Sequence, residues 1–451
     1  MSVWAEKIQR DKENIIEDLS KNIRKEHSWL VTKKLVGDDY DRAREIVKTA
    51  VFNNRELLHE ERLETIQHVM GRLTGYGPLQ ELFVGRVHVP GIGTKDGMVN
   101  ANEITEIMIV PAPDNKPPIV FFGCRGRRFY AGNHYFHDNQ HLLQYCQKIC
   151  DDSERSLITD SPIQDAWLKD GTRVNVIAFG ASPLGPTVTM RKSPLLRPPL
   201  PMEELVKSNM LPEFAARLCR DVLNKGYAKV GIFGRTDSGK TTFMKAFALF
   251  YPPTKRIIIA ETSYEFFLPG FDNCLNLVEV ISGGKVIVDM TMLCNAINRS
   301  NPDISVVGEL RSKEIVAALQ IAASTNCFLT TGHAGSISDL RIRIAGMHRD
   351  AGIELPRDSL DETISTLSDF IIFFGKETKT QEEKRTMMSM EEVIPGGYRT
   401  IIRFDFDEFA ASGKRQWIYE NTISKEMLSH LAFQGAELLP EYKEIKQKYL
   451  Y

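Results

Sequence analysis

Hydrophobic and charged positions alternate in a helical pattern along residues 1 to about 72. Apolar side chains recur at near-helical spacing between Leu57 and Leu73. The pattern stops at Gly75-Tyr76-Gly77-Pro78, because glycine and proline both disfavour a continuing helix. We therefore predict a helical N-terminal extension over residues 1–72.

Short apolar strands and helical segments alternate from residue 73 to residue 192. Residues 104–110 and 119–122 have the composition of strands, and residues 139–149 have that of a helix. Four prolines then fall within residues 193–203, and proline at this density makes a semi-rigid, extended linker. This pattern predicts a smaller α/β domain over residues 73–192 and a linker that limits interdomain movement.

A second alternation of strands and helices fills residues 204–451. Strands are predicted at 256–260, 304–307 and 328–331, with helical runs between them. Such an alternation is typical of an open parallel sheet with crossover helices. A further strand at residues 228–233 runs directly into a glycine-containing loop and a helix. The fold class predicted for the whole chain is therefore α/β.

Composition narrows the class of protein. Of the 451 residues, 42% are hydrophobic, and 57 Lys and Arg against 59 Asp and Glu leave a net charge of −2. This balance gives no general basic surface for nucleic acid. No apolar run approaches the roughly 20 residues that span a bilayer, and the N-terminus lacks the apolar core of a signal peptide. Seven scattered cysteines fit a reduced, cytoplasmic protein.

The loop after the strand at residues 228–233 fits the phosphate-binding pattern G-x-x-x-x-G-K-[ST]. Its glycines let the backbone approach a triphosphate, so that N–H groups and the next helix N-terminus face the anion. Lys240 would reach the β- and γ-phosphates, and the Thr241 hydroxyl would join the Mg²⁺ shell. We predict that ATP and Mg²⁺ bind at Gly234, Arg235, Thr236, Asp237, Ser238, Gly239, Lys240, Thr241 and Thr242.

Asp237 complicates this prediction, because it places a carboxylate inside the loop, two residues before Gly239. If the side chain points outward into solvent, it is harmless. If it points inward, it repels the phosphates and weakens ATP binding, at a cost that grows in a low-dielectric pocket. The sequence leaves both orientations open.

Two other predicted strands end in groups that suit nucleotide chemistry. Glu309 would lie at the carboxyl edge of the sheet, where a carboxylate can hold Mg²⁺ through water or orient the attacking water. Gly308 stands where many phosphate-loop enzymes carry an Asp, so Glu309 would serve alone. His333 follows the strand at 328–331 and could donate to a γ-phosphate. The alternatives are a solvated strand-end acid and a structural histidine.

A pair of acids follows the strand at 256–260. If a helical turn follows Thr262, Glu261 and Glu265 share a face and could flank one water or metal ion. Taken alone, the pair would be surface charge.

In order and spacing, these four segments resemble the Walker A, Asp box, Walker B and His box of the type II/type IV secretion ATPases. The resemblance continues through residues 75–79, 103–109, 168–175 and 189–192 and covers roughly residues 60–420. The helical extension makes the chain most similar to the Tad-type pilus-assembly branch.

The resemblance implies a RecA-like ATPase domain over residues 204–451, preceded by a smaller PAS-like α/β domain, and a homo-hexameric ring. ATP would lie between the two domains, with Arg173 and Arg191 reaching its phosphates. Arg299 and Arg311 match arginines around Walker B that act within a subunit or across the interface. Such a motor is cytoplasmic and meets the membrane through platform or channel proteins of a pilus or secretion system.

The sequence departs from the family pattern at several positions, which keeps other functions open. Arg235 and Asp237 replace two glycines of Walker A, and Thr262 stands where the Asp box has its aspartate. A slow ATPase fits as well as a fast one, and a catalytically weak, nucleotide-gated assembly scaffold is the first alternative. A DNA-handling RecA-like motor is the second, and the near-neutral charge disfavours it.

A cluster of potential zinc ligands lies at residues 134–150. Its members are His134, His137, His141, Cys146 and Cys150. Their residue types suit Zn²⁺, but the spacing matches no named zinc pattern. The favoured interpretation is an amphipathic helix capped by Asp138, with Leu142, Cys146 and Ile149 turned to the core.

Overall fold

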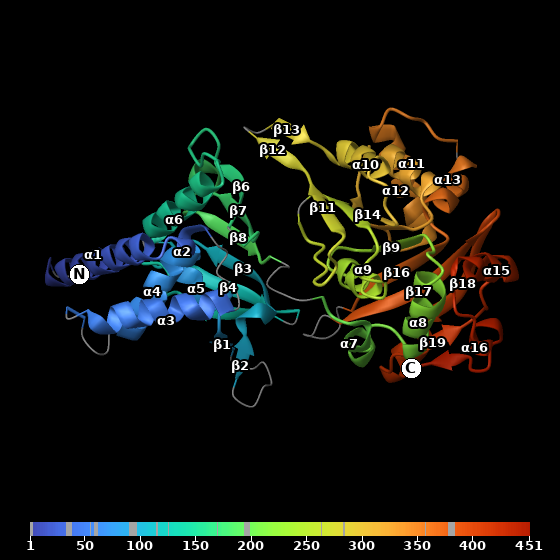
Figure 1. Ribbon diagram of the computed structural model, residues 1–451, viewed down its shortest axis with the longest axis horizontal. Coiled ribbons are helices and arrows are strands. Elements are labelled where there is room, and N and C mark those ends of the chain that lie inside the picture. Colours follow the sequence, from blue (N-terminus) through green and yellow to red (C-terminus); the bar gives the residue numbers. More distant parts are fainter. Residues whose placement is uncertain are drawn as a thin grey trace. The chain divides into compact units, whose positions relative to one another are not determined.

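The computed structural model (Figure 1) describes residues 3–32, 38–54, 56–57, 62–89, 97–113, 116–124, 126–168, 170–193, 199–262, 264–282, 285–356, 358–377 and 384–451. The chain divides into two compact units, Met1–Arg197 and Pro198–Tyr451, called unit 1 and unit 2 below. Residues 194–198 of the predicted linker lie outside the described part. No helix among the described residues is long and apolar enough to cross a membrane.

Unit 1 begins with helices that share a hydrophobic core of their own. They are α1 (Val3–Glu26), α2 (Trp29–Thr32), α3 (Asp38–Asn53) and α4 (Arg62–Thr74). Ile23, Val47 and Val69 are among the buried residues that hold them together. Burying these apolar stripes against one another supplies most of the stability of such helices.

The rest of unit 1 is a six-stranded antiparallel sheet with a helix packed against it. The strand order is β5-β4-β3-β8-β7-β6. The strands are β3 (Ile104–Val110), β4 (Ile119–Cys124), β5 (Arg127–Gly132), β6 (Ile163–Trp167), β7 (Arg173–Ile177) and β8 (Thr187–Arg191), and the helix is α6 (Asn139–Asp152). Two short helices, η2 (Gly77–Leu79) and α5 (Gln80–Phe83), and the hairpin of β1 (Arg86–His88) and β2 (Met98–Asn100) precede them.

Unit 2 is built on a ten-stranded sheet with the order β11-β10-β14-β15-β9-β16-β17-β18-β19-β20. The strands from β11 to β16 in this order are parallel, and those beyond are antiparallel. They are β9 (Val230–Gly234), β10 (Ile257–Glu261), β11 (Cys274–Val278), β14 (Ile304–Leu310), β15 (Phe328–Gly332), β16 (Phe370–Lys376), β17 (Arg385–Ile394), β18 (Gly397–Phe404), β19 (Trp417–Tyr419) and β20 (Tyr449–Leu450).

Helices cover both faces of this sheet (Figure 1). One face packs against α8 (Glu213–Leu218), the π-helix η6 (Cys219–Asn224), α9 (Lys240–Ala248) and α15 (Lys425–Gln434). The other face packs against α10 (Met290–Asn298), α11 (Ile315–Ser324), α12 (Ile337–Asp350) and α13 (Ser359–Leu367). Ile257 and Ile259 point to the first core and Ile258 to the second, since successive strand residues face opposite sides.

The remaining elements of unit 2 are short. They are α7 (Met202–Lys207), the hairpin of β12 (Val280–Ser282) and β13 (Lys285–Val288), α14 (Phe406–Ser412) and α16 (Pro440–Lys443). Because both faces are covered, the central strands β9, β10 and β15 are buried along their whole length, which explains their continuous apolar sequences.

Candidate functional site

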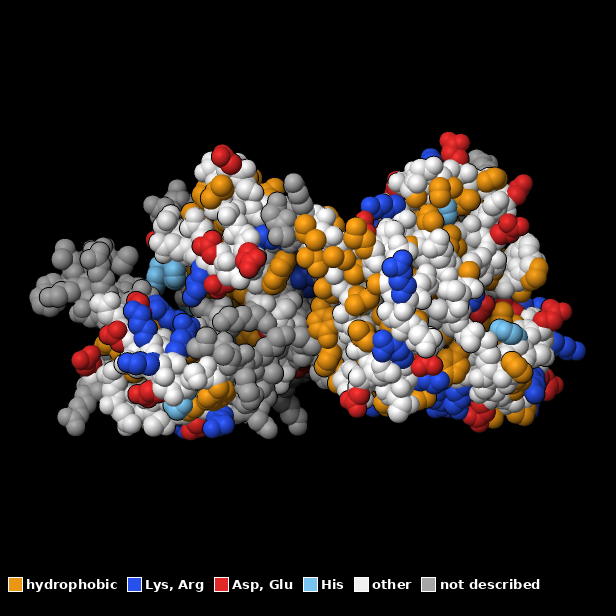
Figure 2. Space-filling view, turned by 45° about the horizontal axis from the view of Figure 1, so that its top comes forward, with side chains coloured by type: hydrophobic (Ala, Val, Ile, Leu, Met, Phe, Trp, Pro, Cys, Tyr) orange, Lys and Arg blue, Asp and Glu red, His pale blue; other side chains and the backbone are white. Residues whose placement is uncertain are grey.

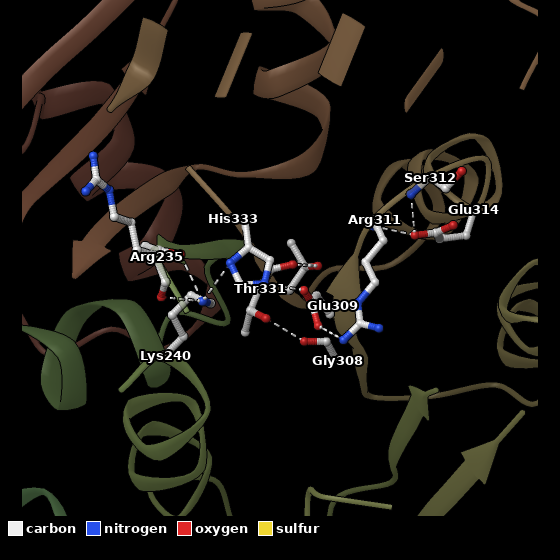
Figure 3. A network of polar contacts seen from close by, with 11 residues as sticks. Arg235, Lys240, Gly308, Glu309, Arg311, Ser312, Glu314, Thr331 and His333 are labelled. Carbon is white, nitrogen blue, oxygen red and sulfur yellow. Dashed lines mark hydrogen bonds and ion pairs between the residues drawn. The ribbon is translucent and has the colours of Figure 1, made fainter. Parts of the chain in front are cut away.

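The carboxyl ends of three neighbouring strands bring the sequence-predicted groups together. Strands β14, β15 and β9 are adjacent and parallel, and they end beside Glu309, His333 and the loop that begins at Gly234. The carboxyl ends of parallel strands meet at one edge of the sheet, which is where such sheets place ligands. Figure 3 shows Lys240, His333 and Glu309 side by side at this edge.

The loop between β9 and α9 has backbone conformations that its sequence permits. Gly239 has φ +92° and caps the N-terminus of α9, a conformation that favours glycine. A Cβ on Gly234 would lie 2.3 Å from the carbonyl oxygen of Phe374, so only glycine fits there. Asp237 also lies in the left-handed region, with φ +61°. The loop thus follows the tight path that an anion-binding backbone requires.

Lys240 is buried at the base of the loop. Its Nζ donates hydrogen bonds to the carbonyl oxygens of Gly234 (2.9 Å) and Arg235 (3.0 Å). Burial lowers the pKa of its ammonium. Thr241 and Thr242 follow in the first turn of α9. The side chain of Arg235 is exposed and points away from Lys240 (Figure 3), so only its backbone takes part in the cradle.

His333 lies between Lys240 and Glu309. Its Nδ1 is 3.5 Å from Lys240 Nζ, and its Nε2 is 2.8 Å from Glu309 Oε1. An ammonium can only donate, so Nδ1 accepts and the ring proton belongs on Nε2. Burial, together with the charge of Lys240, lowers the pKa of His333 below its ordinary value of 6.5. The imidazole is therefore neutral at pH 7.

A β-bulge aims Glu309 at this site. The register between β14 and β15 shifts between Val307 and Leu310, and bulges of this kind redirect side chains. The Thr331 hydroxyl donates to the Gly308 carbonyl at 2.6 Å, which satisfies a group that the irregular register frees. The side chain of Glu309 is 19% exposed and pairs through Oε2 with Arg311.

The second carboxylate oxygen of Glu309 has room for a further partner. His333 Nε2 is close to Oε1 but lacks the alignment of a hydrogen bond, so among the described residues this buried oxygen has no donor. The buried Ser238 hydroxyl in the loop also lacks a partner within the described part of the chain. Buried polar atoms are normally satisfied. These two unsatisfied oxygens, Glu309 Oε1 and the Ser238 hydroxyl, fit a site that receives a polar ligand with its water or metal shell.

The interpretation of Glu261 and Glu265 as a helical pair is wrong. Residues 264–268 form no helix, and Ser263 lies outside the described residues. Glu261 Oε2 instead accepts the backbone N–H groups of Glu265 (3.1 Å) and Phe266 (3.0 Å). Burial raises the pKa of Glu261 to about 7. Its carboxyl group organises the loop after β10, and the charge of Glu265 lies close enough to act on it.

Asp237 is turned to the outside of the loop, which decides between its two predicted orientations. Its carboxylate pairs with Arg385 (2.6 Å) and Lys376 (3.1 Å). Sequence reasoning missed these two cations. Only the folded structure shows these contacts, because Arg385 and Lys376 are 148 and 139 residues from Asp237 in the sequence.

The other predicted arginines lie in different places. Arg311 contacts Glu309 within the site. Arg299 caps the C-terminus of α10, and the carbonyl of the next residue, Ser300, accepts a hydrogen bond from Arg256 at the start of β10. It therefore lies near the amino edge of the sheet, one strand length or about 20 Å from Glu309. Within one chain, Arg299 does not reach the site. Arg173 and Arg191 belong to unit 1.

Three residues of the histidine and cysteine cluster, His141, Cys146 and Cys150, lie on α6, and His134 and His137 precede it. Asp138 accepts the His141 N–H and caps α6, as predicted, and Cys146 and Cys150 are buried in the core. His137 and His141 stack on each other, with ring centroids 5.0 Å apart. The described residues contain no group of three or more metal-ligating side chains placed to hold an ion.

Comparison with known proteins gives several relatives in sequence. An uncharacterized protein of Methanocaldococcus jannaschii is 28% identical over 266 residues, which cover 58% of this chain and 46% of that protein. The type IV secretion system protein VirB11 of Brucella suis is 26% identical over 301 residues, covering 60% and 80%. PtlH of Bordetella pertussis, also a type IV secretion system protein, is 29% identical over 231 residues, covering 47% and 65%. The chain spans less than half the length of the first of these relatives.

Solved structures give weaker likenesses. The VirB11 ATPase of Brucella suis in complex with sulphate has a TM-score of 0.35 and 23% identity, covering 64% of this chain and 90% of its own. The ATPase DotB of Legionella pneumophila has a TM-score of 0.48 and 17% identity, covering 65% and 78%. These scores carry no weight in the assignment.

The sequence match to a family is extensive. The model of the family described as "Type II/IV secretion system protein" matches residues 101–370, which is more than half of the 451 residues. The matched segment contains the loop at Gly234–Lys240, Glu309 and His333. The chain therefore belongs to the type II/IV secretion system protein family.

Proposed function

We propose that this chain is an ATP hydrolase that serves as the motor of a pilus-assembly or secretion system. The observation that carries the proposal is the placement of a neutral His333 between the buried Lys240 and Glu309 at the carboxyl edge of the sheet. A phosphate-loop lysine and a strand-end carboxylate are groups that phosphoryl transfer to water uses, and the adjacent ring can donate to a phosphate oxygen.

Each group has a separate role in this proposal. The loop backbone and Lys240 bind the phosphates, and the ammonium exchanges its two carbonyl partners for phosphate oxygens. Glu309 Oε1, buried without a donor among the described residues, orients the attacking water and accepts its proton. Thr241 and Glu309 would hold Mg²⁺, Glu309 through water, and the ion neutralises charge on the phosphates when bound. Arg311 stabilises the transferred group from beside Glu309.

The wider architecture is proposed by family resemblance. Residues 204–451 would form a RecA-like domain and residues 73–192 a PAS-like domain, joined by the linker at 193–203. Six copies would form a ring in which Arg173 and Arg191 reach the phosphates and Arg299 acts on a neighbouring subunit. Figure 2 shows a group of hydrophobic side chains along one side of unit 2, and the exposed apolar residues of unit 2 include Leu275, Val286, Ile287 and Met292. Exposed apolar surface supports self-association.

The partners follow from the same resemblance. Two relatives are named as type IV secretion system proteins. We propose that the motor works at the cytoplasmic face of the membrane, on platform or channel proteins of a Tad-like pilus or a conjugation or secretion channel. The scaffold alternative loses support, since the charge of Asp237 is compensated by Arg385 and Lys376. A net charge of −2 disfavours a DNA-handling motor.

Lys240→Ala tests the proposal. Wild-type protein should bind a fluorescent ATP analogue with Mg²⁺ and release phosphate, and Lys240→Ala should bind at least about tenfold more weakly, because a charge-assisted contact is lost. Lys207→Ala is the control, since Lys207 is exposed on α7 and pairs only with its helix neighbour Glu204 among the ion pairs of the described residues. Wild-type protein that binds no ATP, or equal binding by Lys240→Ala, would refute the proposed site.

A further inference from the structure

Lys376 and Arg385 place two cations side by side on neighbouring strands. Lys376 ends β16, Arg385 begins β17, and the two are partners in the antiparallel register. Like charges in directly opposed positions destabilise a sheet. The pairing is therefore favourable only where an anion lies near both side chains.

Asp237 supplies that anion from the loop between β9 and α9. Its Oδ1 accepts from Arg385 Nη2 at 2.6 Å, and its Oδ2 accepts from Lys376 Nζ at 3.1 Å. Arg385 Nε also donates to the backbone carbonyl of Asp237 at 3.1 Å. Partial burial opposes ionisation, but Arg385 and Lys376 hold the pKa of Asp237 below its ordinary value. We call this arrangement of Asp237, Arg385 and Lys376 the Asp237 clasp.

The clasp fixes a backbone conformation that the residue would not adopt readily alone. Asp237 has φ +61°, in the left-handed region that disfavours side chains with a Cβ, although Asp tolerates it better than most. Arg385 donates hydrogen bonds to both the carboxylate and the backbone carbonyl of Asp237, so the two contacts hold the peptide as well as the side chain. The Arg385 stem also covers the loop, with Cδ 2.9 Å from where a Cβ on Gly239 would lie.

The strand ends that carry the clasp are themselves anchored. Arg415 is 7% exposed, and its Nη1 donates to the carbonyls of Arg385 (3.1 Å) and Asn209 (2.9 Å). Its Nη2 pairs with Glu377, the residue after β16, at 2.8 Å. Arg385 thus reaches the loop from a fixed position, which is what a residue that orients another group needs.

We propose that Arg385 and Lys376 are positioning residues of the nucleotide site, which hold the Asp237 carboxylate outside the loop and keep the loop in its phosphate-binding shape. The inference rests on the proposed function, in which this loop binds ATP. It explains how an acid occupies a phosphate-binding loop. The carboxylate harms ATP binding only when its cations are removed.

A second-site rescue tests the proposal, with a fluorescent ATP analogue as the probe. Arg385→Ala should weaken binding about tenfold or more, because the freed carboxylate repels phosphate and the loop loses its support. Asp237→Gly combined with Arg385→Ala should bind at least about threefold more tightly than Arg385→Ala alone, because the carboxylate that repels phosphate is gone. Lys384→Ala is the control, because it removes an exposed positive charge one residue before Arg385.

Amide hydrogen exchange without nucleotide separates this inference from the proposed function. Arg385→Ala should speed exchange in residues 234–240, whether or not the wild-type protein binds ATP. Unchanged exchange, unchanged affinity of Arg385→Ala, or failure of Asp237→Gly to restore it would each overturn the clasp. If Arg385→Ala does not fold, Arg385→Lys is the second variant. It keeps one cationic contact and should show the same effects at smaller size. Wild-type behaviour of Arg385→Lys in both measurements would equally overturn the proposal.

Discussion

Arg173 and Arg191 occupy directly opposed positions on the antiparallel strands β7 and β8. Glu106 on β3 is the register partner of Arg191 on its other side. Two like charges in opposed positions weaken a sheet unless other groups compensate them. In the proposed function both arginines contact the phosphates of ATP.

Replacing both arginines by alanine should make particle shape and hexamer formation independent of which nucleotide is bound. In the wild type, a non-hydrolysable ATP analogue should compact the particle and promote hexamers relative to ADP, because charge-assisted contacts to the γ-phosphate form only in the closed state. The double variant should bind ADP nearly normally and lose this difference in small-angle scattering and sedimentation. Arg128→Ala, an exposed arginine on β5 of the same sheet, is the control. One shape and one mass for the wild type with both nucleotides would contradict domain closure.

The lowered pKa of His333 predicts a loss of activity in acid. The unfolded chain takes up the imidazole proton near pH 6.5, whereas the folded site takes it up only at lower pH. The free energy of unfolding therefore falls as pH drops below 6.5. ATP turnover should fall in the same range, because a protonated ring cannot accept from Lys240 and places a second cation beside it.

His333→Gln provides the comparison for this pH dependence. The amide can occupy the same space but does not titrate, so turnover should be lower at pH 7.5 and nearly flat between pH 7.5 and about 5.5. Phosphate release measured at each pH for both proteins is the test. If His333→Gln retains the acid limb of the wild type, another group is responsible for it.

Glu261→Gln should stabilise the protein at high pH. The pKa of Glu261 is about 7 in the folded chain against 4.5 ordinarily, so the unfolding free energy falls as pH rises from 4.5 to 7 and is level above that range. Gln keeps an oxygen for the N–H groups of Glu265 and Phe266 and carries no buried charge. Urea unfolding should show Glu261→Gln to be more stable than wild type by roughly 1–3 kcal/mol at pH 8, with little gain at pH 5.

The exposed Glu354 offers a matched control for that comparison, and Glu354→Gln should leave the unfolding free energy unchanged at both pH values. ATP turnover of Glu261→Gln should stay within about threefold of wild type, since its carboxyl group serves the loop and not the reacting phosphate. If Glu261→Gln destabilises the protein equally at pH 5 and pH 8, burial does not raise the pKa of Glu261.

The sequence predicted the parts of the site that lie at strand ends. Gly234–Lys240, Glu309 and His333 each follow an apolar strand, and a parallel sheet necessarily brings such ends to one edge. The prediction of a helical turn after Glu261 was wrong. The Glu261 carboxylate accepts backbone N–H groups of the following loop, and a four-residue spacing between two acids does not reveal such hydrogen bonds. The partners of Asp237 could not be predicted, since register between β16 and β17 decides which cations face the loop.

The central claim is that Glu309 acts on the water that attacks ATP bound at Lys240. Phosphate release by Glu309→Gln, measured in a single turnover together with ATP affinity, tests it most directly. The account predicts that ATP binds within about twofold of wild type and that release slows by about 100-fold or more, since only the charge that orients the water is lost. Release at the wild-type rate would contradict the account and transfer the catalytic role to another acid, with Glu261 and Glu265 the first to be replaced in turn.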